Sequence, residues 1–267
     1  LGRGHDARSV HKLCIRIGVP DSQRYGVVKV PAPQHAPGLA SDEASIYKAR
    51  MTQWLFPPRP TPSLPIVGDD RRLPVRRILC VGQNYAAHAR EMGSDPDKQT
   101  PFFFSKPADA LVSDGTNPAY PSATGNLHYE AELVAAIGEG GRIVGWAVGC
   151  DLTRRDLQAE AKKAGRPWDA AKGFDQSAPC GAVTLGALPD PAGAITLTVN
   201  GETRQSSRLD DMILNPDRIV EEAGRLWTLE AGDLIFTGTP SGVGPVVKGD
   251  RIVVAIAGLE TLAFEVA

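Results

Sequence analysis

Short hydrophobic runs, bounded by turns rich in glycine and proline, recur along most of the chain. Runs of this length predict β-strands rather than helices. We expect strands over residues 77–81, 102–105, 129–137, 143–150, 195–200, 233–237 and 251–256. Residues 138–141 are mostly glycine, so the strands on either side of them are predicted to form a hairpin.

Three segments are predicted to be helical, over residues 85–92, 153–164 and 217–227. Asn84 is the predicted N-cap of the first helix, and Gly93 is its predicted C-terminal stop. Strands and helices do not alternate regularly, and no G-x-G-x-x-G motif follows a strand. The pattern therefore argues against a Rossmann domain and indicates a β-rich protein with few helices.

The first part of the chain differs from the rest. Two short strands are expected over residues 13–17 and 25–30, and residues 31–68 are loop-like and rich in proline. Prolines between residues 56 and 62 exclude a helix and remove donors that a central strand needs. We therefore predict a small N-terminal domain with a proline-rich connector over residues 1–74, and a main domain over residues 75–267.

Two acidic residues interrupt the most hydrophobic of the predicted strands. Glu130 and Glu132 are two positions apart, so on a strand their side chains point to the same face. Like charges on a half-buried strand repel each other and are costly to desolvate. A hard divalent cation removes that cost, because carboxylate oxygens suit Mg²⁺, Mn²⁺ and Ca²⁺. For an isolated pair of this kind, a solvated strand face is the commoner explanation.

The hairpin predicts a third carboxylate beside this pair. With the turn centred near Gly140, Asp151 falls roughly opposite Glu130. Three carboxylates would then converge on one point, which favours a metal site over a solvated face.

Composition narrows the classes of function. The formal net charge of the 267 residues is −2, without a long run of like charge, which argues against nucleic acid or a membrane surface as partner. No hydrophobic run approaches the ~20 residues that span a bilayer, and residues 1–9 contain no signal-peptide core. Scattered cysteines in hydrophobic settings predict buried thiols of a cytoplasmic protein: they are Cys14, Cys80, Cys150 and Cys180.

Two helices carry further candidate residues. His88 and Glu91 share a helix face, so the carboxylate can orient the imidazole as a base that activates water. An exposed ion pair is the alternative. Arg155 and Gln158 share a face of the helix that follows Asp151 and would point toward a metal there. Otherwise they are ordinary solvated residues.

Two more segments have a chemical and a structural interpretation. Lys172 precedes Gly173 and Phe174, a setting in which a lysine is usually a surface residue. Residues 236–244 form a glycine-rich loop after a strand, without the Lys-Ser/Thr ending of a P-loop. The amides of this loop could bind a substrate carboxylate, and a plain turn is the alternative.

Six segments, taken together and in this order, resemble the fumarylacetoacetate hydrolase superfamily. They are residues 81–88, 102–107, 128–132, 151–158, 172–175 and 237–244. Within the superfamily, residues 90–93 and 100–110 are most similar to bacterial fumarylpyruvate hydrolases. The region before residue 74 matches only as a small variable N-terminal unit.

The resemblance implies an α+β fold, a mixed β-sandwich roll, in a protein that forms a homodimer. It also implies Mg²⁺ or Mn²⁺ held by Glu130, Glu132 and Asp151. Three carboxylates on a divalent ion leave a formal charge of about −1, so a dianionic substrate needs additional positive charge nearby.

The resemblance assigns the remaining site residues as well. It implies His88 and Glu91 as the water-activating dyad and Lys172 as a catalytic cation. It also implies contacts with a small dioxo-acid substrate by Arg155, Gln158 and Thr239.

The implied reaction is hydrolytic cleavage of a C–C bond in a 2,4-dioxo acid, such as fumarylpyruvate to fumarate and pyruvate. Hydroxide formed at the dyad attacks the C4 carbonyl, and cleavage leaves the pyruvate enolate, whose charge a Lewis acid stabilises. Decarboxylation of oxaloacetate yields the same enolate and is the first alternative. A non-catalytic binding module with this fold is the second.

Overall fold

The computed structural model describes residues 54–93, 95 and 102–267. The chain divides into two compact units, Leu1–Pro58 and Arg59–Ala267, and the second unit is the one described below. The predicted strands at 13–17 and 25–30 and the residue Cys14 lie outside the described residues. The small N-terminal domain ending near residue 74 stays a prediction.

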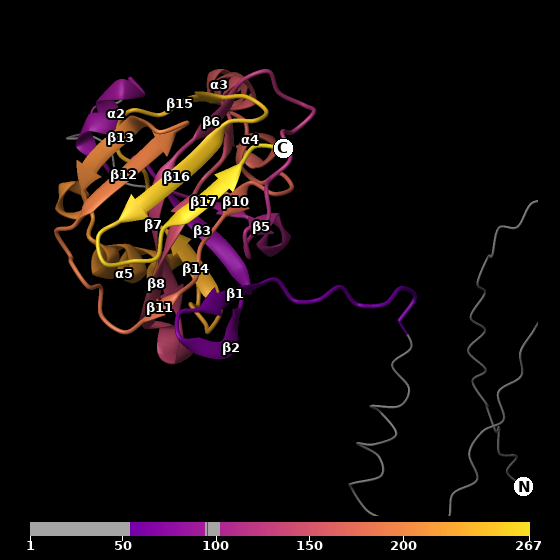
Figure 1. The fold of residues 1–267 in the computed structure, drawn as a ribbon, viewed down its shortest axis with the longest axis vertical. Coiled ribbons are helices and arrows are strands. Elements are labelled where there is room, and N and C mark those ends of the chain that lie inside the picture. The colour runs from indigo at the N-terminus through magenta and orange to yellow at the C-terminus, as the bar shows by residue number, and fades with distance from the viewer. Residues whose placement is uncertain (1–53, 94, 96–101) are drawn as a thin grey trace, which may run out of the picture. The chain divides into compact units, whose positions relative to one another are not determined.

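Three sheets and two short strand pairs make up most of the second unit (Figure 1). The largest sheet has the order β11-β8-β7-β14-β3-β4. Its strands are β3 (Arg77–Gly82), β4 (Phe102–Lys106), β7 (Ala131–Ile137), β8 (Ile143–Cys150), β11 (Thr184–Leu185) and β14 (Asp233–Phe236). The second sheet has the order β13-β12-β16-β17. Its strands are β12 (Ala194–Val199), β13 (Glu202–Arg208), β16 (Arg251–Ile256) and β17 (Leu262–Glu265).

The remaining elements are short. A three-stranded sheet contains β6 (Leu127–Tyr129), β9 (Thr153–Arg154) and β15 (Gly244–Val246), and the strand pairs are β1 (Ser63–Ile66) with β2 (Asp69–Pro74) and β5 (Leu111–Val112) with β10 (Ala178–Pro179). The α-helices of the described residues are α2 (Ala86–Glu91), α3 (Arg155–Ala164), α4 (Asp169–Lys172) and α5 (Pro216–Leu226). Single 3₁₀ turns occur at Ala108–Ala110, Glu139–Gly141 and Leu209–Asp211.

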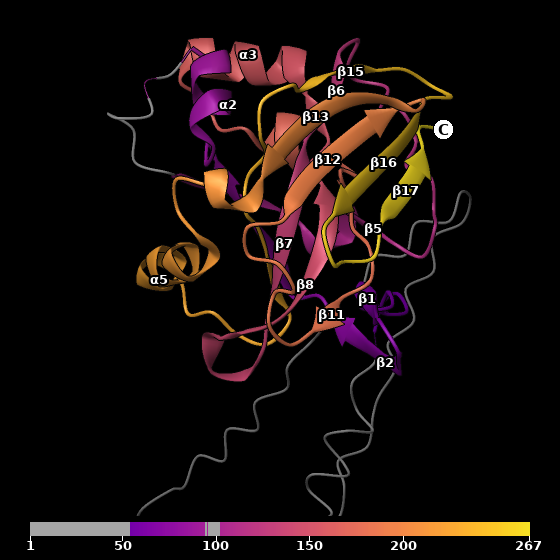
Figure 2. The ribbon, with the colours of Figure 1, turned by 60° about the vertical axis from the view of Figure 1, so that its left-hand side comes forward.

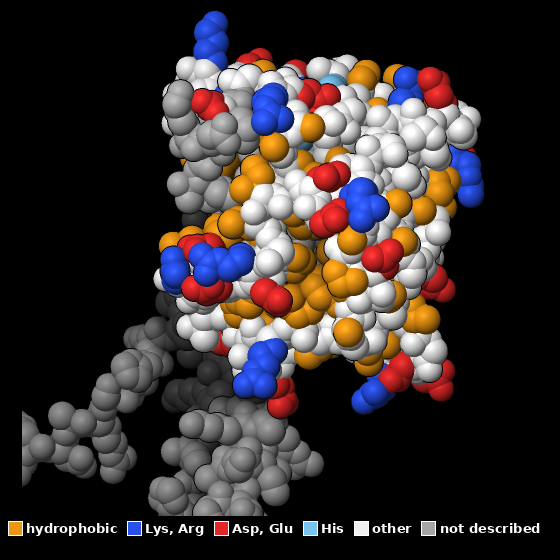
Figure 3. Space-filling view, turned by 90° about the vertical axis from the view of Figure 1, so that its left-hand side faces the viewer, with side chains coloured by type: hydrophobic (Ala, Val, Ile, Leu, Met, Phe, Trp, Pro, Cys, Tyr) orange, Lys and Arg blue, Asp and Glu red, His pale blue; other side chains and the backbone are white. Residues whose placement is uncertain are grey.

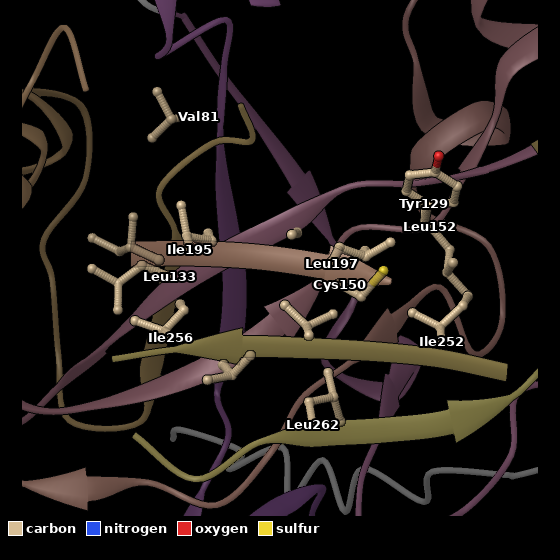
Figure 4. Close-up of a cluster of buried hydrophobic side chains, with 14 of the residues drawn as sticks. Val81, Tyr129, Leu133, Cys150, Leu152, Ile195, Leu197, Ile252, Ile256 and Leu262 are labelled. Carbon is tan, nitrogen blue, oxygen red and sulfur yellow. The ribbon is translucent and has the colours of Figure 1, made fainter. Parts of the chain in front are cut away.

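The two larger sheets pack face to face around the main hydrophobic core (Figures 2 and 4). Leu133, Ala135 and Ile137 of β7 alternate toward this core, where Ile195 of β12 and Ile256 of β16 lie among their neighbours. Burying these side chains removes apolar surface from water, which is the main favourable contribution to folding. The sandwich therefore gives β7 and β8 a rigid setting.

The opposite face of the large sheet is buried too. Val134 and Ala136 of β7 point to a second core, which the β1–β2 hairpin closes with Leu64 and Leu73. Every residue of β7 is consequently buried. This explains why its sequence is continuously hydrophobic apart from one acid, Glu132.

The structure confirms the α+β class, with mixed sheets and few helices. The predicted hairpin is present, because β7 and β8 pair antiparallel and Ala131 lies opposite Cys150. The β1–β2 hairpin was missed in a segment predicted to be loop-like. The edge strand β13 was missed because only Gln205 of its seven residues is buried, so it has no hydrophobic alternation.

Three local predictions were wrong. The strand predicted over 129–137 breaks at Glu130, where the chain leaves the three-stranded sheet and enters the large sheet. The helix predicted from Thr153 begins at Arg155, because Thr153 and Arg154 pair with β6 instead. Asn84 does not cap α2, because its buried amide bonds Leu214 and the carbonyl of Thr237.

Cys80, Cys150 and Cys180 are buried free thiols, as the sequence predicted. Among the described residues, none of the helices has both the length and the apolar character needed to cross a membrane. One end of the sandwich collects α2, α3, β6 and β15 in both ribbon views (Figures 1 and 2). The candidate site lies at this end.

Candidate active site

The hairpin register brings three carboxylates together. The amide of Asp151 donates to the carbonyl of Glu130 over 2.9 Å, which continues the β7–β8 ladder by one pair. Ligand oxygens of Glu130, Glu132 and Asp151 all lie within 4.8 Å of one another. These residues are 5%, 1% and 0% exposed, so the cluster is not a solvated strand face.

Two cations bind the carboxylates of this cluster. The Lys172 ammonium donates to Glu130 Oε2 over 2.8 Å, to Asp151 Oδ2 over 2.7 Å and to the buried hydroxyl of Thr153 over 2.6 Å. Arg155 Nη2 donates to Glu130 Oε1 over 2.6 Å. Lys172 is 2% exposed, so it is not the surface residue that its local sequence suggests.

Lys106 is a third cation of the cluster, and sequence reasoning assigned it no role. It is the last residue of β4, it is 1% exposed, and its Nζ lies 2.7 Å from Asp151 Oδ1. It also donates to the carbonyls of Leu152 and Lys172. A lysine one residue beyond the Phe102–Phe104 run was the available signal, although such a lysine more often ends a strand in solvent.

Glu132 has a different environment from the other two acids. Its Oε2 accepts a hydrogen bond from the Gly238 amide over 2.7 Å, and none of the ion pairs found in the described residues includes it. Burial, reinforced by the charges of Asp151 and Glu130, raises the pKa of Glu132 well above its usual value. Burial also favours the neutral form of Glu130, but Lys172 and Arg155 outweigh it and lower the pKa of Glu130.

This donor set fits a divalent metal ion. Three buried carboxylates converge, and one of them has only a backbone amide to offset its charge. Oxygen ligands of this kind are those that Mg²⁺ and Mn²⁺ prefer. Lys106, Lys172 and Arg155 balance the formal charge of the three carboxylates when all are ionised, so a divalent cation bound to them would make the site positive. A dianionic ligand would therefore be attracted.

The predicted dyad also forms. His88 Nδ1 lies 3.0 Å from Glu91 Oε2, and the buried His88 ring lines the same cavity as Glu130 and Glu132. Among the described residues, the Nε2 atom of His88 has no hydrogen-bond partner. The Gly242 amide donates to the other oxygen of Glu91 over 3.1 Å. The carboxylate is thus fixed between the imidazole and the loop.

The glycine-rich loop serves the site differently from the sequence hypothesis. Its amides at Gly238 and Gly242 bind the protein's own acids, Glu132 and Glu91, rather than pointing free toward a substrate. Gly238 has φ +96°, and a Cβ there would lie 2.8 Å from the Cβ of Asn84. The loop is therefore a positioning element that requires glycine at this point.

The predicted substrate contacts line the cavity as well. Arg155 Nη1 donates to Gln158 Oε1 over 2.6 Å, and both side chains face the cavity from α3. Thr239 is buried, and its hydroxyl accepts a hydrogen bond from Gln205 over 2.8 Å. Gln205 also accepts from the amide of Ala131 between the two glutamates. Sequence reasoning missed Gln205, because β13 is polar throughout.

His128 is a further neighbour without an assigned role. Burial and the charge of Arg155 lower its pKa to about 4, so the ring is neutral at neutral pH. Its Nε2 lies 2.9 Å from Asn126 Oδ1, and its Nδ1 lies 3.4 Å from Arg155 Nε. A neutral ring can donate to Asn126 and accept from Arg155, which helps to hold the guanidinium against Glu130.

These groups line one cavity that is partly open to solvent. Charged and polar lining residues are His88, Glu130, Glu132, Arg155, Gln158, Lys162, Lys172, Thr239 and Gln83. The apolar and glycine lining is Val81, Gly82, Met92, Phe104 and Trp168. All nine residues that the sequence singled out lie around this cavity or bond a residue that lines it.

Comparison with known proteins agrees with the geometry. The model of a family described as fumarylacetoacetate (FAA) hydrolase C-terminal matches residues 77–267. A fumarylpyruvate hydrolase of Ralstonia sp. is 42% identical over an alignment of 188 positions, which covers 66% of this chain and 98% of that protein. The mitochondrial oxaloacetate tautomerase of Homo sapiens is 41% identical over 203 residues, covering 72% of this chain and 91% of the relative.

Solved structures give the same result. The crystal structure of fumarylpyruvate hydrolase from Pseudomonas aeruginosa in complex with Mn²⁺ and pyruvate superimposes with a TM-score of 0.78. It is 48% identical in sequence and covers 80% of this chain and 99% of its own. Since the family model matches well over half of the residues and the relatives exceed 40% identity, the chain belongs to the fumarylacetoacetate hydrolase family.

Proposed function

We propose that the protein is a divalent-metal-dependent hydrolase that cleaves a C–C bond in acylpyruvates, with fumarylpyruvate as the preferred substrate. The observation that carries this proposal is the arrangement of two groups around one cavity. The buried triad of Glu130, Glu132 and Asp151 faces the space that the His88–Glu91 pair also lines. Relatives named fumarylpyruvate hydrolase, one of them bound to Mn²⁺ and pyruvate, support the choice of substrate.

The triad would hold Mg²⁺ or Mn²⁺. When bound, the ion would supply a Lewis acid for the α-keto carboxylate end of the substrate. Lys106 and Lys172 hold Asp151 through its two oxygens, and the Gly238 amide holds Glu132 through Oε2. Indirect partners of this kind orient ligand groups and set their basicity.

The dyad would act as the general base. His88 donates its Nδ1 proton to Glu91, which leaves Nε2 free to accept a proton from water at the cavity surface. The Gly242 amide holds Glu91 in place. The negative charge of the Glu91 carboxylate then stabilises the imidazolium that forms. Hydroxide then attacks the carbonyl next to the scissile bond. Lys172 is the proposed catalytic cation, and Arg155, Gln158 and Thr239 are the proposed substrate contacts.

A second candidate is chemistry on oxaloacetate. Relatives that are 41% identical are named oxaloacetate tautomerase, so a tautomerase activity is favoured as the alternative, alongside decarboxylation of the same compound. Both reactions pass through an enol or enolate of an α-keto acid without attack by water. His88 would then matter only as a proton carrier, or not at all.

Parallel assays separate these candidates. Loss of ultraviolet absorbance from fumarylpyruvate should occur with Mg²⁺ or Mn²⁺ and stop with EDTA, and fumarate and pyruvate should form in equal amounts. Oxaloacetate should release little CO₂ and interconvert slowly between its enol and keto forms. Brisk turnover of oxaloacetate, without turnover of any acylpyruvate, would contradict the hydrolase proposal.

The His88→Ala variant adds a test of the base. It should lose hydrolysis by about 100-fold or more, as expected for a general base. Any activity on oxaloacetate that needs no attacking water should fall less. Equal losses in both reactions would contradict the assigned role.

We also propose that the protein is a cytoplasmic homodimer. Figure 3 shows an area of hydrophobic side chains on one face of the molecule, and Ile213 and Leu226 are among the large hydrophobic residues that are exposed. Apolar areas of this kind are typical of interfaces. Light scattering coupled to gel filtration should give twice the chain mass of 28.4 kDa, and a monomer mass would contradict the proposal.

A further inference from the structure

We propose that Lys162 is a specificity-determining residue that binds a second carboxylate at the far end of the substrate. The inference rests on the proposed acylpyruvate function and deepens it. On this basis the preferred acylpyruvates are dicarboxylates, and Lys162 recognises their distal carboxylate.

The helix α3 places Lys162 in line with two residues of the site. Arg155, Gln158 and Lys162 are at positions i, i+3 and i+7, so they share one helix face, and all three line the cavity. Arg155 reaches the floor of the cavity, where it bonds Glu130 over 2.6 Å. Seven residues correspond to ~10 Å along a helix axis. Lys162 therefore stands at a distance from the carboxylate triad, on the same wall.

The positive charges at the cavity floor are already paired. Lys172 bonds Glu130 and Asp151, and Arg155 bonds Glu130. In contrast, no carboxylate of the described residues forms an ion pair with Lys162. Lys162 lines the cavity and is also exposed to solvent; desolvation and the positive charge of Arg155 lower its pKa, against a smaller opposing effect of Glu130. A carboxylate bound beside it would provide the missing counter-charge.

The wall next to Lys162 fits the carbon chain that such a substrate has. The Nζ atom of Lys162 lies 5.7 Å from the centre of the Trp168 ring, and Trp168 packs edge-on against Phe102. Trp168 and Phe104 line the cavity together, and their ring centres are 5.8 Å apart. An acyl chain that leaves the triad would cross this aromatic surface before its end reaches the ammonium. A flat, unsaturated chain ending in a carboxylate matches both features.

The test compares two substrates that differ only at the distal group. Fumarylpyruvate carries a carboxylate there, and crotonylpyruvate carries a smaller, uncharged methyl group. Wild-type protein should prefer fumarylpyruvate in kcat/KM. In Lys162→Met this preference should shrink by about 10- to 100-fold, which is the effect expected for a hydrogen bond to a charged group. The loss should appear mainly in KM, because Lys162 does not contact the reacting atoms.

Two further variants complete the design. Lys163→Met is the matched control, because Lys162 and Lys163 are both exposed on α3 but Lys163 does not line the cavity. It should keep the wild-type preference. Lys162→Arg should keep most of it, since the charge remains. A wild type without preference, or a Lys162→Met variant with the wild-type ratio, would overturn the inference.

A binding measurement distinguishes this failure from failure of the proposed function. If neither acylpyruvate is hydrolysed, the hydrolase proposal fails, and calorimetry with Mn²⁺-loaded protein still tests Lys162. The probes are 2-oxoadipate and 2-oxohexanoate, which again differ by a carboxylate and a methyl group. Tighter binding of 2-oxoadipate that is lost in Lys162→Met would support the role of Lys162. Equal affinities in wild type would overturn it.

Discussion

Three buried carboxylates lie side by side in this protein, and each is held by different partners. Glu130 is bound by Arg155 and Lys172, and Asp151 by Lys106 and Lys172; among the described residues, Glu132 is bound by the Gly238 amide alone. Removing one member of a buried ion pair leaves an uncompensated charge, which is strongly destabilising. The residues around the triad therefore affect stability as well as chemistry.

Lys106 should stabilise the metal-free protein. The Lys106→Met variant leaves Asp151 Oδ1 and two buried carbonyls without their cation, so we expect a loss of about 3 kcal/mol or more in the free energy of unfolding. Saturating Mn²⁺ should reduce this loss, because the ion would neutralise Asp151. Chemical denaturation with and without Mn²⁺ measures both. The exposed Lys248→Met control should change stability by less than about 0.5 kcal/mol. An identical loss with and without Mn²⁺ would contradict the account.

Glu132 should exchange a proton for the metal. Its raised pKa means that the folded metal-free protein holds a proton there more tightly than the unfolded chain, whose glutamates titrate near ~4.3. Tighter proton binding at Glu132 stabilises the folded protein. This stabilisation is complete below the pKa of the unfolded chain and is lost as the pH rises through the pKa of Glu132 in the folded protein. Metal ligation requires the carboxylate, so Mn²⁺ binding near neutral pH should release protons.

Calorimetry in buffers of different ionisation enthalpy, such as PIPES and Tris, measures that release. The Glu132→Gln variant should release none and should bind Mn²⁺ weakly. Its hydrolytic activity should fall by about 100-fold or more, because even indirect partners of metal ligands are worth about 10- to 100-fold. Retained activity, or a wild type whose Mn²⁺ binding heat is the same in both buffers, would count against Glu132 as a ligand.

Among the elements, the loop that follows β14 links the two halves of the site. Its amides at Gly238 and Gly242 hold Glu132 and Glu91, which belong to the triad and the dyad respectively. A change in the backbone of this loop should therefore disturb both groups, although neither glycine contributes a side chain.

Gly238→Ala tests this link. The positive φ of residue 238 disfavours alanine, and the added Cβ would clash with the Cβ of Asn84. We therefore expect the variant to lose about 2 kcal/mol or more in the free energy of unfolding and to bind the metal more weakly. Gly249→Ala is the control, because Gly249 also has a positive φ, +86°, but a Cβ there meets no atom within 4 Å. Denaturant unfolding and Mn²⁺ titration compare the two variants. If Gly249→Ala proved as harmful as Gly238→Ala, the close approach would not be what matters.

The elements that could be predicted from the sequence are those whose hydrophobic pattern is set locally. The β7–β8 hairpin is an example, and its register was enough to place Asp151 beside Glu130. The burial of Lys106 and Gln205 could not be predicted, because it depends on distant segments that cover them. A lone lysine or a glutamine in a polar strand has the local sequence of a surface residue. The break at Glu130 was hidden because the chain passes from β6 to β7 without a turn residue to mark the change of sheet.

At the scale of the whole molecule, a two-sided sandwich supports a site at one of its ends. The large sheet is buried on both faces, so β7 and β8 have little freedom to move apart. The acids at the ends of these strands are consequently held close together before any ion binds. A preorganised cluster of like charges costs folding free energy, and a bound cation returns part of it.

The most direct test of the metal-centre account is turnover of fumarylpyruvate by EDTA-treated protein during titration with Mn²⁺. We predict no loss of absorbance without the ion, a rate that rises until about one ion is bound per chain, and equal amounts of fumarate and pyruvate. Turnover that continues unchanged in EDTA would contradict a metal-dependent mechanism. Tight Mn²⁺ binding without any hydrolysis would contradict the proposed reaction.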